Sequence, residues 1–116
     1  MTTNGLDEFD NITHNAERDY PALRRLFGAY FHQDWQDEYV TSTNAVQAFL
    51  RAAPYAAVDT TRHELDGVLA STLDDEELGR LLRDGFDCNY VPQANDLGNR
   101  AWLEQLRDLM APVRPA

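Results

Sequence analysis

The first long apolar stripe of the chain lies between residues 23 and 31. Its side chains recur at three- and four-residue spacing, which is the spacing of one helical face: Leu23, Leu26, Phe27, Tyr30 and Phe31. Pro21 stands two positions before the stripe, and a proline is tolerated in the first turn of a helix. We therefore predict a helix over about residues 21–31, with Asp19 or Tyr20 as its N-cap.

Apolar residues at helical spacing predict four further helices, at about residues 42–50, 55–71, 73–84 and 98–110. Thr72 and Asp75 stand three residues apart, so we expect them to form a capping pair at the start of the third of these helices. Gly85 is expected to end that helix in a left-handed conformation. Residues 86–96 lack a helical period and contain Pro92, which predicts a loop. The loop side chains expected to fold onto the core are Phe86, Cys88, Tyr90 and Val91.

The pattern predicts an all-α fold. No segment shows the sustained alternation of apolar and polar residues that is typical of a half-buried strand. We expect residues 19–116 to form a single compact bundle of about five helices, because a chain of 116 residues is the size of one domain. Residues 1–18 are mostly polar and are expected to form a loosely ordered N-terminal arm.

The charge of the chain is strongly acidic. Twenty Asp and Glu residues face ten basic residues, which gives a formal net charge of −10, and all ten basic residues are Arg. The absence of Lys excludes a P-loop and a Schiff-base mechanism. An acidic protein repels phosphate backbones and attracts basic proteins, so we expect a basic protein partner and no direct contact with nucleic acid.

Cysteine usage and hydropathy point to the cytoplasm. Cys88 is the only cysteine, so the chain cannot form an internal disulfide bond. The first residues are acidic where a signal peptide needs a basic and then an apolar run. No apolar run approaches the roughly 20 residues that span a bilayer, so no membrane contact is expected.

Metal-binding and nucleophilic side chains lack the spacing of a catalytic site. His32, Asp34 and His63 belong to no recognised metal-binding motif, so we predict no metal or other cofactor. Cys88 stands near Asp84 and Asp87 in sequence, and negative charge disfavours the thiolate form. Cys88 is therefore expected to be a structural thiol, and no catalytic residue is predicted.

Two acidic segments are candidates for contact with a partner. Trp35 and Tyr39 stand among three acids, which is a pattern typical of an interface anchor, although the spacing of Trp35 favours the core. Acids at residues 74–77 complement the dipole of a helix N-terminus, whereas Asp84 and Asp87 oppose the dipole near a helix C-terminus. An acid at an unfavourable place indicates a partner that needs it.

Several motifs together resemble a known family. They are LRRLFGAYFHQDW at residues 23–35, the following DEY, AVQAFLRAAP, ELDGVLAS, DDEELGRLL, the Cys–Asn–Tyr loop and AWLEQLRDLM. Over about residues 20–111 the chain resembles the all-helical immunity proteins of bacterial contact-dependent growth inhibition (CDI) systems. The resemblance implies a non-enzymatic inhibitor that binds the C-terminal toxin domain of a CDI effector as a one-to-one heterodimer.

Toxins of this kind are often nucleases that act on tRNA, and nucleases need basic surfaces to hold phosphates. The implied mechanism is occlusion of the toxin's substrate-binding or active site. A motif shared among inhibitors of different toxins serves mainly their common fold, so we expect the contacts elsewhere. The residues predicted to contact the toxin are Asp34, Asp37, Glu38, Tyr39, Asp74, Asp75, Glu77, Asp84, Asp87 and Tyr90.

Two alternatives stay open. The first is a small hydrolase that uses a metal held by His32, Asp34 and His63, or Cys88 with a histidine as base. The second is an acidic adaptor for some other basic protein.

Overall fold

The computed structural model describes residues 15–110, and within that range it contains helices and no β-strand. The helices are α2 (Ala16–Asp19), α3 (Pro21–Tyr30), α4 (Trp35–Glu38), α5 (Ser42–Ala52), α6 (Tyr55–Leu69), α7 (Asp75–Arg80) and α8 (Asn99–Leu109). A π-helical turn, η1 (Leu81–Gly85), continues α7, and a 3-10 turn, η2 (Pro92–Asn95), precedes α8. The predicted all-α fold is confirmed.

The five predicted helices are all present, and the short α2 and α4 add to them. Residues 16–18, which were assigned to the N-terminal arm, form most of α2, and Ala16 is buried. Residues 1–14 of the predicted arm lie outside the described residues.

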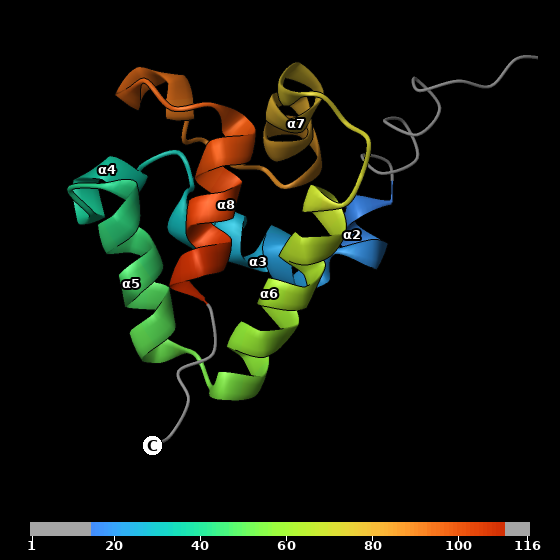
Figure 1. Ribbon diagram of the computed structural model, residues 1–116. Coiled ribbons are helices and arrows are strands. Elements are labelled where there is room, and N and C mark those ends of the chain that lie inside the picture. Colours follow the sequence, from blue (N-terminus) through green and yellow to red (C-terminus); the bar gives the residue numbers. More distant parts are fainter. Residues whose placement is uncertain (1–14, 111–116) are drawn as a thin grey trace, which may run out of the picture.

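The central helix of the bundle is α3, which packs against both α5 and α6 (Figure 1). α8 packs against α6 and α7 and crosses in front of α3 in this view. α5 forms one side of the molecule, with α4 at its outer end. The apolar stripe of α3 is therefore enclosed by helices from the whole length of the described chain.

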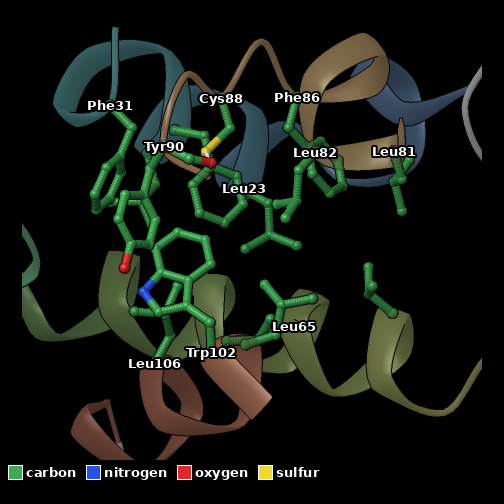
Figure 2. Close-up of a cluster of buried hydrophobic side chains, with 14 of the residues drawn as sticks. Leu23, Phe31, Leu65, Leu81, Leu82, Phe86, Cys88, Tyr90, Trp102 and Leu106 are labelled. Carbon is green, nitrogen blue, oxygen red and sulfur yellow. Dashed lines mark hydrogen bonds between the residues drawn. The ribbon is translucent and has the colours of Figure 1, made fainter. Parts of the chain in front are cut away.

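Aromatic rings fill the centre of the core. The ring of Trp102 lies 4.8 Å from that of Tyr90 and 5.3 Å from that of Phe31, measured between centroids. Figure 2 shows these three side chains beside one another. Such pairs add to the free energy of burial when they meet edge-on or offset, and Phe31 and Trp102 are perpendicular. The indole Nε1–H of Trp102 donates to Ser42 Oγ at 3.2 Å, which joins α8 to α5.

Carboxylates from distant residues cap two of the helices. Glu64 Oε1 accepts hydrogen bonds from the backbone amides of Ala22 and Leu23 at the start of α3, at 2.9 and 3.0 Å. The Asp75 carboxylate accepts from the amides of Asn99 and Arg100 at the start of α8, at 3.1 and 2.8 Å. Because the first amides of a helix have no partner within it, these bonds satisfy them and fix how the helices meet.

Local expectations around α7 were partly wrong. Asp74 caps α7 in place of the expected Thr72, and a capping box joins Asp74 and Glu77. Gly85 is not left-handed, because the π-helical turn carries the chain through it, and the positive φ of 57° falls on Asp87. Of the loop side chains expected in the core, Phe86, Cys88 and Tyr90 are buried, whereas Val91 is exposed.

Candidate interaction surface

Residues 32–40 connect α3 to α5, and we call this segment the acidic corner. Its one helical turn, α4, buries Trp35, whose ring lies 5.4 Å from that of Phe31. The side chains of Asp34, Asp37 and Glu38 are exposed. The structure thus confirms that Trp35 belongs to the core and that its acidic neighbours lie at the surface.

The side chain of His32 holds the acidic corner in shape. Its Nδ1 accepts a hydrogen bond from the backbone amide of Asp34 at 3.0 Å, and its Nε2 lies 3.2 Å from Glu38 Oε1. A neutral imidazole with its proton on Nε2 makes both bonds at once, accepting at one nitrogen and donating at the other. His32 therefore fixes both the start of α4 and the direction of an exposed carboxylate at its end.

Tyr39 and Val40 follow α4 and face in different directions. The half-buried Tyr39 ring lies 6.1 Å from that of Tyr30 on α3. Burial, with a further contribution from the Glu38 carboxylate, raises the pKa of Tyr39 above its ordinary value, so its hydroxyl stays neutral. Val40 is 88% exposed.

The loop at residues 86–91 lies against the acidic corner. The backbone amide of Asn89 donates to the carbonyl of Phe31 at 2.8 Å, and the ring of Tyr90 meets that of Trp35 edge-on at 5.4 Å. Asp87, exposed and left-handed, stands two residues before Asn89. The structure therefore brings together two segments that carry predicted contact residues and are about fifty positions apart in sequence.

Neither segment contains a Lys or Arg side chain. No Arg occurs between Arg25 and Arg51, and none occurs between Arg83 and Arg100. Asp34 and Asp37 form no ion pair with any side chain in residues 15–110. Their negative charge is thus available to a positively charged partner.

Four other predicted contact residues stabilise the fold: Tyr90, Asp74, Asp75 and Glu77. Tyr90 is only 7% exposed, so it supports the acidic corner from beneath and does not present its ring to a partner. Asp74, Asp75 and Glu77 all accept or exchange hydrogen bonds at the starts of α7 and α8. Asp84 is exposed on η1.

Two hollows among the described residues lie close to predicted contact residues or their neighbours. A groove of about 290 Å³ runs between α3, α5 and α6 and reaches the acidic corner at Tyr30, the residue that contacts Tyr39. Most of its lining is apolar: Ala22, Arg25, Leu26, Ala29, Tyr30, Phe49, Ala52, Ala53, Pro54, Ala57 and Thr61. A polar hollow of about 430 Å³ lies between α7, η2 and α8.

The family model for the CdiI immunity protein matches residues 19–110, which is most of the chain. The chain belongs to the CdiI immunity protein family. It is also similar in structure to a chain in the crystal structure of a CdiA-CT/CdiI complex from Y. kristensenii, with a TM-score of 0.75 and 26% sequence identity. That match covers 80% of this chain and 99% of the other. No curated protein matches the sequence.

Membership of the CdiI family removes the hydrolase alternative, because CdiI immunity proteins are toxin inhibitors and not enzymes. The candidate catalytic side chains agree with this. Burial raises the pKa of the Cys88 thiol from 9.0 to about 12, so it is not a nucleophile at neutral pH. His63 pairs with Asp59 on the surface of α6, at 3.4 Å. In the part of the chain that the structure describes, no three His, Cys, Asp or Glu side chains gather in a way that could hold a metal ion.

Two features of this CdiI protein escaped the sequence analysis. Val40 was not among the predicted contact residues, although it stands between the end of α4 and the Thr41 cap of α5, where no helical face can bury it. The positioning role of His32 depends on its distances to Asp34 and Glu38, which the sequence does not contain. Among residues 15–110, each helix is too short or too polar to cross a bilayer.

Proposed function

We propose that this CdiI protein binds the C-terminal toxin domain of its cognate CDI effector one-to-one and neutralises it in the cytoplasm. The observation that carries the proposal is the acidic corner, where Asp34 and Asp37 are exposed and form no ion pair with any side chain in residues 15–110. Similarity to a chain from a CdiA-CT/CdiI complex supports a toxin domain as the partner.

The proposed toxin is a nuclease, with tRNA as its substrate. A nuclease holds phosphates with Arg and Lys, so its substrate site is basic. The net charge of −10 accelerates encounter with such a surface through long-range attraction. Carboxylates at the acidic corner then occupy the positions that substrate phosphates would take.

Inhibition follows from occlusion and needs no chemistry from the inhibitor. The acidic corner rests on buried rings of Trp35 and Tyr90, so it keeps its shape when a partner approaches. A preformed surface loses little conformational entropy on binding, which favours high affinity. Asp87 in the loop and Asp84 on η1 are two further exposed acids.

Co-expression with the cognate toxin domain tests the immunity function. Cells that express the toxin domain alone should stop growing, and cells that also express this protein should grow normally. Equal growth arrest in both cultures would refute the immunity function.

A second measurement tests the nuclease assignment separately. Purified toxin domain should cleave tRNA, and cleavage should cease when the inhibitor reaches a one-to-one molar ratio. Protection of cells from a toxin domain that cleaves neither tRNA nor other nucleic acid would leave the immunity function standing and refute the nuclease.

A further inference from the structure

Val40 has the largest exposed fraction among the large apolar side chains of residues 15–110, at 88%. Single apolar side chains are common on protein surfaces and need no explanation by themselves. The surroundings of Val40 set it apart, because the chain is fixed on both sides of it and acids stand close by in sequence.

The backbone around Val40 is held in place. On one side, the Tyr39 amide donates to the Trp35 carbonyl at 3.0 Å, and the Tyr39 ring rests on Tyr30. On the other side, Thr41 Oγ1 accepts from the Asn44 amide at 3.0 Å as the N-cap of α5. Val40 is thus presented to solvent by a chain with little freedom to lose on binding.

His32 adds a second constraint on the same segment. Its bonds to the Asp34 amide and the Glu38 carboxylate span the whole of α4, the turn that leads into Val40. The exposed acids Asp37 and Glu38 stand three and two positions before Val40 in the sequence. An apolar centre within a charged rim is the common anatomy of a protein–protein contact.

An apolar groove lies close to Tyr39, the residue before Val40. The Tyr39 ring lies 6.1 Å from that of Tyr30, and Tyr30 is among the residues that line the groove between α3, α5 and α6. Val40 faces solvent and does not line that groove.

We propose that Val40 is the apolar anchor of the toxin interface, and that His32 is the positioning residue that presents it. The complementary toxin surface is an apolar hollow with Arg or Lys side chains on its rim. This inference rests on the proposed function and adds the side chain that enters the toxin.

The test is the dissociation constant of the complex between the full chain and the purified toxin domain. Val40→Ser should weaken binding about tenfold to a hundredfold, because a buried valine is replaced by a polar side chain. Its thermal unfolding should match that of the wild type, because Val40 makes little contact in the free protein. The matched control is Tyr55→Ser, which removes a larger apolar side chain that is 67% exposed at the start of α6, and it should bind within about twofold of the wild type.

The outcomes separate the anchor from the function. A wild type that binds and protects, together with a Val40→Ser variant of equal affinity, would refute the anchor and leave the immunity function intact. A wild type that neither binds nor protects would refute the function itself. Equal losses for Val40→Ser and Tyr55→Ser would also overturn the assignment of Val40 as the anchor.

His32 is tested by two substitutions and a double-mutant cycle. His32→Ala removes both side-chain bonds and should weaken binding about threefold to tenfold through a less ordered corner. His32→Asn should recover part of this loss, because the Asn oxygen can take the place of Nδ1 and accept from the Asp34 amide. In the double variant with Val40→Ser, the effect of His32→Ala should shrink, because His32 acts through Val40.

The positioning role fails under either of two results. One is that His32→Asn binds as weakly as His32→Ala while both remain folded by circular dichroism. The other is that the losses from His32→Ala and Val40→Ser multiply independently.

Discussion

Glu64 should be one of the most important charged side chains for the stability of this protein. It lies on α6 and caps α3, whose own N-cap residue, Tyr20, makes no side-chain cap bond. Pro21 has no amide hydrogen, so the first amides that need a partner are those of Ala22 and Leu23, and both residues are buried. In Glu64→Ala neither amide can turn to water without opening the contact between α3 and α6.

The expected loss follows from these two bonds. A hydrogen bond to a charged acceptor contributes about 1.5–3 kcal/mol, and both bonds share one oxygen of a half-buried side chain. Glu64→Ala should therefore lower the free energy of unfolding by about 2–4 kcal/mol and the melting temperature by roughly 8–16 °C. Glu64→Gln retains an oxygen acceptor without the charge and should cost about 1 kcal/mol.

Urea unfolding followed by circular dichroism measures these differences. The control is Glu104→Ala, which removes an exposed carboxylate of α8 and should change the free energy of unfolding by less than about 0.5 kcal/mol. If Glu64→Ala is as stable as Glu104→Ala, then the cap does not hold α3 against α6 and the reasoning is wrong.

Three further predictions concern the remaining polar and small residues. Gly79→Ala should lower the free energy of unfolding by about 1–3 kcal/mol in calorimetry, because the new Cβ would lie 2.7 Å from Asn99 Nδ2. Gly28→Ala is the matched control: its Cβ meets nothing within 4 Å, so it should raise the free energy of unfolding by up to about 1 kcal/mol. Asp74→Ala should cost about 1 kcal/mol through the lost capping box and leave toxin affinity within about twofold. Burial raises the pKa of Cys88 from 9.0 to about 12 in the folded protein, so the thiol of the unfolded chain ionises at a lower pH. The free energy of unfolding should therefore fall as pH rises above about 9. In urea titrations at several pH values, Cys88→Ala should show a smaller fall.

The helices of this protein could be predicted from the sequence because long apolar stripes leave few ways to be buried. The stripe from Leu23 to Phe31 and the apolar face around Trp102 each fit one helical face. Both are buried as expected, except for the half-buried Tyr30 and the exposed Leu109. Helix ends were harder to predict. The helix α7 begins at Asp75, so its N-cap is Asp74 and not the predicted Thr72.

Long-range polar contacts could not be predicted from the sequence. Glu64 meets the amide of Ala22 from 42 positions away, and no local pattern marks a carboxylate that caps a different helix. The burial of Tyr90 was expected, but the bond from the Asn89 amide to the carbonyl of Phe31, which fixes its loop, could not be predicted. The predicted contact residues therefore include exposed acids at the corner, exposed acids at Asp84 and Asp87, and side chains used within the fold.

Exposed acids at the corner were nevertheless placed correctly at the surface. Asp34 and Asp37 are exposed because Trp35 between them takes the inward position on a single helical turn. A period of 3.6 residues gives that arrangement from sequence alone. Their contact with the toxin stays a prediction.

The most direct test of the account is the salt dependence of toxin binding for three proteins. They are the wild type, Asp34→Asn with Asp37→Asn, and a control of equal charge, Glu104→Gln with Asp108→Asn, which changes exposed acids on α8. Between about 50 and 300 mM salt, the affinity of the wild type and of the control should fall together by about tenfold or more, since screening weakens attraction between exposed charges. The corner variant should bind about tenfold more weakly at low salt and respond less to added salt. A corner variant with the affinity and salt response of the wild type would contradict the claim that the acidic corner binds the toxin.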